Sequence, residues 1–598
     1  MSTSAVTALQ VADEDFLVAT LIERCPKLMM VRELMMNALE AARHAPETRR
    51  FVEISALPMD GVDKLAIWNT GPGMDDHELL KICNIASSLG KQKSLTGNFG
   101  MGAKVASLPS NQRGMRYRSC KNGRVHEVIL CKRDDVYGRL RRYDPETDTF
   151  IEVLDVTEIA LQDGRSLDED WTEVVLLGNE IEQDTVKNPY NGDPEQDAQW
   201  LATYLYHRFY RLPDGVKVTL LKGTNKLDGN RQFETIPARL RYFERYETVS
   251  VAGGIKIHYL YDAQYNGTGH NKSISGAIAS AVSTCAVVYR DEMYDLKKGR
   301  QWTFDAPIFG IPFGAKHISV HIELPESFSV VSEAYRQFLQ YAAGDQSRLQ
   351  ASDFADLVRD NRPPWLIEVI HSFAPDSRTS DQIRDELQRL LNQLRVRRVS
   401  PKVTPQGGTN VSQGVGPAID AVPGVNSGNG GPGQKARPTD LSVIPTGAKR
   451  AEMFKNLERA PEIIPLNTDE EIDEKGLKGR AARYVMEAGQ LFVNMQYPAI
   501  GEMRAQLEAE YAGTSDLDTM RTLVQQHAQD SMILRVGRTV VYALAKQLNK
   551  EWDQKALETA SSPESLSMAA DNFGDAMQNI RRAIGKALRT SRTDVDAA

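Results

Sequence analysis

The chain has 598 residues, of which 41% are apolar and 25% charged; this globular composition excludes wholesale disorder and predicts three or four domains at about 150 residues each. Lysine and arginine total 72 against 80 aspartates and glutamates, a net charge of −8, which argues against binding nucleic acid through bulk positive charge but leaves local basic patches open. No run of about 20 apolar residues occurs, so we expect no membrane span.

The N-terminal residues and the cysteines indicate a reducing compartment. The first 16 residues are polar and acidic, unlike a secretory signal. The five cysteines are scattered and form no CxxC pair. We therefore expect a cytoplasmic protein with inert thiols and no zinc site.

Residues 14–180 predict a first domain of α+β class. Residues 27–44 have helical periodicity, and residues 51–57 and 64–69 read as two strands joined by the turn PMDG. Further strands are expected at 125–131, 149–155 and 172–178. Helix, hairpin, glycine-rich loop and antiparallel strands in that order predict a sheet with helices on one face.

Residues 195–345 predict a second α/β domain. Strands are expected at 216–223, 254–262 and 317–326, and a helix at 331–342. Residues 346–399 predict a helical extension that ends in a basic run.

The remaining chain predicts a tethered module. Residues 400–440 lack aromatic side chains and are rich in Gly, Pro, Ser and Asn, which predicts a flexible, disordered linker. Residues 450–598 are polar and helical in pattern, without strand signals. We expect a C-terminal helical domain that binds a protein partner.

Polar residues on the predicted helix 27–44 form a first motif. Glu33 and Asn37 are four residues apart and share a helical face, and Glu40 lies close to it. An asparagine oxygen suits Mg²⁺, and a carboxylate one turn earlier could polarise a water for attack on a γ-phosphate. Taken alone, the pattern also fits a solvated polar stripe.

Two glycine-rich segments complete the pattern. The strand at 64–69 runs into Asn69-Thr70-Gly71-Pro72-Gly73-Met74, where glycines permit close approach of a flat ligand. Residues 97–104 read GNFGMGAK directly before a predicted helix, so backbone N–H groups there could face an anion. Either segment alone also fits an ordinary turn or a flexible loop.

The order and spacing of these three motifs resemble the GHKL ATPase superfamily, which includes the ATP-hydrolysing component of DNA gyrase, MutL, the ninety-kilodalton heat-shock chaperones, histidine kinases and MORC ATPases. The resemblance covers residues 14–180, and SSLGKQKSLTGNFGMGAKVAS is most similar to MORC-type and related prokaryotic ATPases. It implies a Bergerat-type ATP-binding sandwich at 14–180 and an S5-like transducer domain at 195–345.

The resemblance also implies roles for individual residues. Glu33 would be the general base and Asn37 the Mg²⁺ ligand. Thr172 would reach the adenine, while Lys91 and Lys104 would contact phosphates. The implied ATP-binding residues are Asn37, Glu40, Asn69, Gly71, Gly73, Met74, Lys91, Gly97, Phe99, Gly100, Met101, Gly102, Lys104 and Thr172.

Two positions depart from the family pattern. Asn69 stands where the family usually has an aspartate that accepts a hydrogen bond from the adenine amino group. An asparagine can replace it only if its amide is correctly oriented, and the bond is then neutral and weaker. Trp171 stands where a glycine usually precedes the threonine.

A cation from the transducer domain would sense the γ-phosphate. Arg336, at the start of the helix expected at 331–342, is our first choice, with Lys298 and Lys316 as alternatives. Each of the three also fits a surface charge.

The implied activity is Mg²⁺-dependent ATP hydrolysis that drives dimerisation of two N-terminal domains. Basic segments at 113–124, 132–143, 395–398 and 581–592 favour a DNA-associated clamp, although they also fit solvated strand faces and helix ends. The acidic net charge favours the alternative of a chaperone-like remodelling ATPase. A histidine kinase is disfavoured, because only about 13 residues precede the ATP-binding domain.

Overall fold

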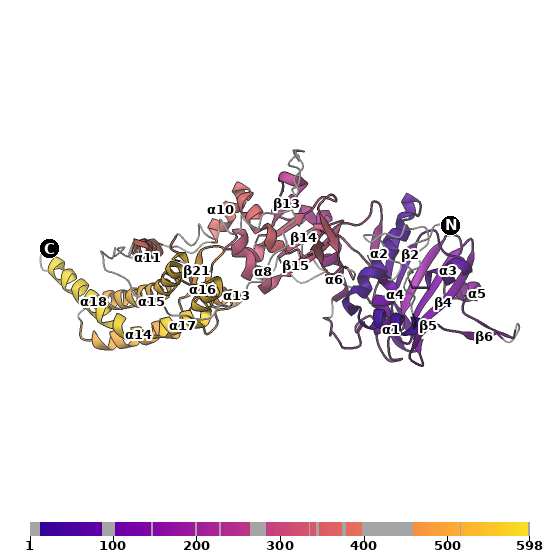
Figure 1. Cartoon of the computed structure of the whole chain (residues 1–598), viewed down its shortest axis with the longest axis horizontal. Coiled ribbons are helices and arrows are strands. Elements are labelled where there is room, and N and C mark those ends of the chain that lie inside the picture. The colour runs from indigo at the N-terminus through magenta and orange to yellow at the C-terminus, as the bar shows by residue number, and fades with distance from the viewer. Residues whose placement is uncertain are drawn as a thin grey trace, which may run out of the picture. The chain divides into compact units, whose positions relative to one another are not determined.

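The computed structural model describes residues 12–85, 102–144, 148–197, 200–225, 229–263, 283–333, 335–342, 346–373, 378–396, 459–514, 516–549 and 551–595. The chain divides into two compact units, Met1–Phe373 and Ala374–Ala598, each described below by itself (Figure 1). Among the described residues, no helix has the length and apolar character needed to cross a membrane.

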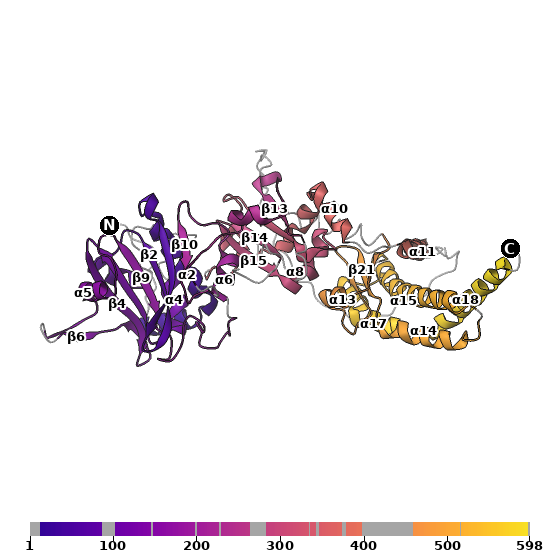
Figure 2. The same ribbon diagram turned by 180° about the vertical axis from the view of Figure 1, so that it is seen from behind.

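The first unit contains a nine-stranded sheet. Its strand order is β11-β10-β1-β2-β9-β3-β4-β5, with β8 paired to β4. Figure 2 shows β2, β9 and β4 within this sheet. The strands are β1 (Phe51–Met59), β2 (Val62–Thr70), β3 (Met115–Lys121), β4 (Arg124–Arg133), β5 (Val136–Arg139), β8 (Leu154–Asp155), β9 (Trp171–Leu176), β10 (Lys217–Leu220) and β11 (Arg231–Gln232).

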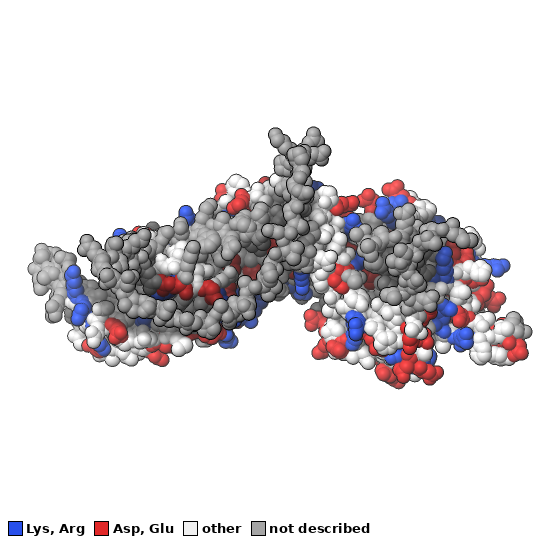
Figure 3. Space-filling view, in the orientation of Figure 1, with Lys and Arg blue, Asp and Glu red and all other residues white. Residues whose placement is uncertain are grey.

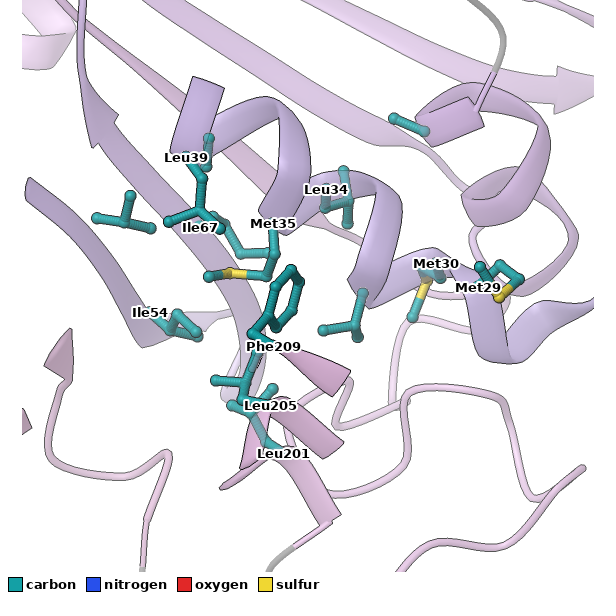
Figure 4. Packing of buried hydrophobic residues seen from close by; sticks show 14 of the residues in the cluster. Met29, Met30, Leu34, Met35, Leu39, Ile54, Ile67, Leu201, Leu205 and Phe209 are labelled. Carbon is teal, nitrogen blue, oxygen red and sulfur yellow. The ribbon is translucent and has the colours of Figure 1, made fainter. Parts of the chain in front are cut away.

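Helices cover one face of this sheet. They are α1 (Glu14–Glu23), α2 (Met30–Arg43) and α4 (Gly102–Ser107), with α3 (Asp76–Ile82) beside β4. The helix α6 (Trp200–Arg208) contributes to the same apolar cluster and also contacts β15 (Glu292–Lys298). The apolar side of α2 is fully buried, and Figure 4 shows Met35 and Leu39 beside Ile54 and Ile67 of the sheet, with Phe209 next to them. This packing fixes α2, so its polar face has a defined position.

The opposite face of the sheet carries a smaller apolar cluster. Cys120 and Trp171 lie there with Ala160 of α5 (Thr157–Gln162). Alternate residues of β3 therefore face two different clusters, because strand side chains alternate in direction. The hairpin of β6 (Arg142–Asp144) and β7 (Thr149–Ile151) is separate from this sheet.

A second sheet belongs to the same unit. Its order is β12-β13-β16-β14-β15, and only the β14–β16 pairing is parallel. The strands are β12 (Arg245–Ser250), β13 (Lys256–Tyr261), β14 (Thr284–Tyr289), β15 (Glu292–Lys298) and β16 (Ile318–Glu323). Around it lie α8 (Gly299–Asp305), α9 (Ala355–Asp360) and α10 (Pro364–Ser372).

Two expectations for this region are wrong. The strand expected at 216–223 in the second domain is β10, which pairs in parallel with β1 of the first sheet. The helix expected at 331–342 is a hairpin of β17 (Val330–Ser332) and β18 (Leu339–Tyr341). Arg336 has φ +58 in the intervening turn, a left-handed conformation that no helix interior adopts.

The second unit contains strands as well as helices. The helices are α11 (Arg378–Val396), α13 (Asp469–Glu474), α14 (Pro498–Glu510), α15 (Leu517–Leu548), α16 (Gln554–Ala560), α17 (Pro563–Asp571) and α18 (Gly574–Val595). The strands are β19 (Glu462–Leu466), β20 (Ala482–Val485) and β21 (Gln490–Asn494), in the order β19-β21-β20.

The expectation of a purely helical C-terminal domain is therefore wrong. Residues 482–494 form a hairpin, and Gly489 in its turn has φ +65, a conformation glycine adopts at no steric cost. The helical extension expected at 346–399 is divided, because α9 and α10 belong to the first unit whereas α11 packs on α15 and β19 of the second. The linker expected at 400–440 lies outside the described residues.

Short 3₁₀ helices complete the first unit: η1 (Lys27–Met29), η2 (Glu47–Arg49), η3 (Leu108–Ser110), η4 (Pro237–Tyr242), η5 (Ala252–Gly254), η6 (Ala306–Phe309), η7 (Ala315–His317) and η8 (Ala351–Phe354). All five cysteines are buried and free of disulfides.

Candidate functional site

A cavity of about 300 Å³ lies between α2, the start of α4 and four strands of the first sheet, β2, β3, β4 and β9. It brings together residues from all three predicted motifs. Its walls include Glu33, Asn37, Glu40, Asn69, Gly73, Met74, Gly102, Lys104 and Thr172. The spacing of the motifs along the chain thus corresponds to one site in space.

The polar face of α2 forms one wall. Glu33 is 9% exposed, whereas Asn37 is exposed and Glu40 half-buried. One carboxylate is thus largely withdrawn from water, while an amide one turn later is open to it. Such an arrangement can bind a hydrated cation beside a partly desolvated base.

Asn69 and Thr172 on the floor of the cavity belong to a row of polar side chains across three strands. Asn69 of β2 lies opposite Thr172 of β9, and Thr172 lies opposite Ser119 of β3. The Ser119 hydroxyl donates to the Trp171 carbonyl at 3.0 Å and accepts from the Met74 N–H at 2.8 Å. Since Ser119 has one hydroxyl hydrogen, the Thr172 hydroxyl is the donor in its 2.9 Å contact with Ser119, and its oxygen keeps lone pairs at the wall of the cavity.

The Asn69 amide has a defined orientation. Its Nδ2 donates to the Thr70 carbonyl at 2.9 Å. The Oδ1 of Asn69, a residue of the cavity wall, is thereby left as the acceptor of this amide. Asn69 and Thr172 both present acceptors, so the floor is complementary to a donor such as an exocyclic amino group.

The glycines after β2 bring the backbone close to neighbouring elements. Gly73 has φ +59, and a Cβ there would overlap the Cys120 carbonyl oxygen. A Cβ at Gly71 would lie 2.9 Å from the Ala41 carbonyl oxygen. Gly73 is part of the cavity wall, whereas Gly71 lets the loop approach α2 beside it.

The first residue of α4, Gly102, lies against the carboxylate of Glu33. A Cβ at Gly102 would overlap Glu33 Oε2, so only glycine leaves that oxygen free. Lys104 is 8% exposed and donates to the Ile82 carbonyl. Burial lowers the pKa of Lys104 to about 8, because the apolar surroundings disfavour the charged ammonium.

Arg32 is a residue of the site that sequence reasoning missed. It is 1% exposed and forms an ion pair with Glu33 Oε1. An arginine on an amphipathic helix normally extends into water, so the helical pattern gave no signal for it. Ser119 was also missed, since a lone serine in a strand has no distinguishing spacing.

Several predicted residues are not brought to the cavity. Among the residues that the structure describes, its walls do not include Arg336, Lys298 or Lys316. Arg336 lies in the β17–β18 turn, Lys298 at the end of β15 and Lys316 in η7. The remaining predicted residues lie outside the described ranges: Lys91, Gly97, Phe99, Gly100 and Met101.

The predicted basic strands are largely paired with carboxylates. Arg118 contacts Glu127 at 2.7 Å and Asp163 at 2.6 Å, and Arg139 contacts Glu152 at 2.6 Å. Figure 3 shows Lys and Arg interspersed with Asp and Glu over the described part of the visible face. These ion pairs reduce the positive charge that the strands could offer to phosphates.

The described residues contain no group of three or more His, Cys, Asp or Glu side chains arranged to hold a metal ion. Mg²⁺ does not require such a group, since it commonly takes one or two protein oxygens together with phosphate and water. The exposed Asn37 amide fits that mode.

Comparison with known proteins finds no family model that matches the chain and no curated protein that matches its sequence. Any function for the cavity must therefore be argued from the motifs and the geometry.

Proposed function

We propose that the protein binds and hydrolyses ATP with Mg²⁺ in this cavity. One observation carries the proposal: the polar face of α2, the glycine turn after β2 and the start of α4 line a single cavity of about 300 Å³. A purine nucleotide needs a flat polar floor, backbone access for phosphates and an oxygen ligand for Mg²⁺. The polar floor is formed by Asn69 and Thr172. Access for the phosphates is provided by Gly102 with Lys104, and the oxygen ligand by Asn37.

Glu33 is the general base of the proposed reaction. Its carboxylate takes a proton from water, whose oxygen bonds to the γ-phosphorus while the bond from that phosphorus to the β–γ bridging oxygen breaks and ADP leaves. Lys104 stabilises charge on the phosphate oxygens, and Asn37 would hold Mg²⁺, which neutralises that charge. Glu40 and Met74 complete the walls.

Adenine is the base that the floor favours. The 6-amino group of adenine is a donor, whereas the 6-oxo group of guanine is an acceptor. The floor presents Asn69 Oδ1 and Thr172 Oγ1 as acceptors. Asn69 therefore performs the task that an aspartate performs in the GHKL superfamily, with a neutral and weaker bond.

The direct test combines nucleotide-binding calorimetry with an assay of phosphate release. We expect Glu33→Ala to bind ATP but to lose turnover, and Asn37→Ala to lose both. Normal turnover by Glu33→Ala, or the absence of binding heat from ATP with Mg²⁺ in the wild-type protein, would refute the proposal.

The wider proposal is an ATP-gated clamp of the GHKL superfamily, nearest to MORC-like prokaryotic ATPases. In this scheme residues 14–180 form a Bergerat-type sandwich, residues 195–345 contribute an S5-like transducer, and ATP binding dimerises the N-terminal domains around DNA. Arg336 remains the first choice for the γ-phosphate sensor, with Lys298 and Lys316 as alternatives, and a closing movement would bring this cation to the cavity.

A chaperone-like remodelling ATPase is the second candidate. The pairing of the basic strands with Glu127, Glu152 and Asp163 favours it over DNA binding. A DNA shift assay across a range of salt concentrations, with and without a non-hydrolysable ATP analogue, separates the two. Analogue-dependent retention on long DNA supports the clamp, and no shift at low salt supports remodelling.

A further inference from the structure

Glu33 belongs to a buried cluster of four charged side chains. Arg32 contacts both Glu33 and Glu292, and Arg208 contacts Oε2 of Glu292. Their side chains are between 2% and 11% exposed. The two positive charges of the guanidiniums equal the two negative charges of the carboxylates. Buried charges are tolerated in a low-dielectric interior when they are paired in this way.

The cluster joins the candidate site to the second sheet. Arg32 and Glu33 lie on α2, whereas Glu292 is the first residue of β15. Arg208 of α6 donates to Glu292 Oε2 through Nε at 2.8 Å and to the Arg336 carbonyl at 3.0 Å. Burial opposes ionisation of Glu292, but the two guanidiniums outweigh it and lower the pKa of this carboxyl to about 2, so it stays charged.

Glu292 determines which donors of Arg32 can reach Glu33. The Nε of Arg32 donates to Glu292 Oε2 at 2.9 Å, and its Nη2 pairs with Glu292 Oε1. Only Nη1 is then directed to Glu33, and it contacts Oε1. Oε2 lies on the other side of the carboxylate, towards Gly102, and is the oxygen that a water could approach.

We propose that Glu292 is a positioning residue for the general base: it holds the Arg32 guanidinium by two of its donors, so that Arg32 orients Glu33 through Oε1 without covering Oε2. Without the Glu292 carboxylate, the guanidinium can turn and bind both oxygens of Glu33 in the fork geometry that arginine favours. A carboxylate bound in this way accepts a proton from water less readily, because two guanidinium donors stabilise its charged form and one of them occupies Oε2. This inference rests on the proposed ATPase function and deepens it.

The test measures kcat, KM and the affinity for a non-hydrolysable ATP analogue in the full-length protein. For Glu292→Gln we expect kcat to fall at least about tenfold, a part of the about 10²- to 10⁴-fold that a general base contributes, with KM and analogue affinity nearly unchanged. Glu292→Asp keeps the charge and should recover part of the lost kcat.

Two further variants keep the test decisive. Arg208→Met/Glu292→Gln removes one charge of each sign, so it provides a balanced cluster if the single variant unfolds, and it should show the same selective loss of kcat. Glu323→Gln is the matched control, because Glu323 binds Arg211 through two contacts of 2.8 Å in the same sheet but shares no arginine with Glu33. It should leave kcat unchanged.

Normal kcat in the balanced double variant, an equal loss in Glu323→Gln, or a loss explained by KM alone would overturn the inference. Failure of the proposed function has a different signature. If Glu33→Ala retains turnover, the function itself falls and this inference with it; if Glu33→Ala is inactive while Glu292→Gln is not, only this inference falls.

Discussion

Lys104 shows how one buried residue can make ligand binding depend on pH. The residue is 8% exposed, and burial lowers the pKa of its ammonium to about 8. A bound phosphate would stabilise the charged form and raise this pKa again. Between the free and bound values, binding must therefore take up a proton.

We expect the affinity for ATP to fall as the pH rises above about 8, by up to about tenfold per pH unit. Below pH 8 Lys104 is already protonated, so this contribution to the pH dependence should vanish. Calorimetry at pH 8.5 in two buffers of different ionisation enthalpy measures the proton uptake directly. Lys104→Met should bind more weakly with no uptake; uptake that persists in this variant would assign the proton to another group.

A second prediction concerns Asn69 and the preference for adenine over guanine. Because its Nδ2 is engaged by the Thr70 carbonyl, its Oδ1 should favour ATP over GTP by about 1–3 kcal/mol, the cost of leaving a buried polar group unpaired. Asn69→Leu should weaken ATP binding and abolish the preference. Competition between the two nucleotides for the wild type and the variant tests this, and equal preference in both would remove Asn69 from base recognition.

At the scale of elements, the start of α4 depends on the absence of a side chain. Gly102 faces Glu33 so closely that a Cβ would overlap Oε2. We expect Gly102→Ala to displace either the carboxylate or the helix and to lower turnover at least about tenfold. Gly138→Ala is the matched control, since a Cβ there meets no atom within 4 Å. Phosphate release by the two variants should differ accordingly; equal activity would mean that α4 shifts without consequence.

How much of this could be read from the sequence depends on the range of the interactions. The mixed α+β class and the helix at 27–44 were predicted correctly because local periodicity determines them. The resemblance of the three ordered motifs to the GHKL superfamily also suggested that Glu33, Asn37 and Gly102 act together, and they do share a cavity. Their chemical roles remain predictions.

Pairings between distant strands could not be read in this way. The place of β10 beside β1 and the alignment of Ser119 with Thr172 arise only when the sheet forms. The apolar residues of segment 331–342 fit both the helical and the strand repeat. The segment forms a hairpin in which Arg336 has a left-handed backbone conformation. The burial of Arg32 depends on Glu292, which is 260 residues away in the chain, so no local pattern could reveal it.

At the scale of the whole molecule, the two units have separate apolar cores. The largest cluster of the first unit draws on residues up to Met293, whereas that of the second begins at Ile383 in α11. Leu387 of α11 packs so closely on α15 that a Cβ at Gly537 would lie 2.6 Å from its Cδ1. The Gln388 side chain also accepts from the Ala460 N–H at 2.7 Å. The helix α11 is therefore an integral part of the second unit.

This predicts where the chain can be divided. A fragment of residues 374–598 should fold by itself and unfold cooperatively, whereas a fragment of residues 400–598 lacks Ile383, Leu387 and Leu391, all buried. Burial of such side chains contributes about 1.5–3 kcal/mol each, so the shorter fragment should lose about 5–9 kcal/mol, a large part of the stability of an ordinary domain. Urea unfolding followed by far-UV circular dichroism measures the difference.

A synthetic peptide of residues 378–396 should restore stability to the shorter fragment when added in trans, because it supplies the missing apolar face. Equal stability of the two fragments without the peptide would show that α11 contributes nothing to this core.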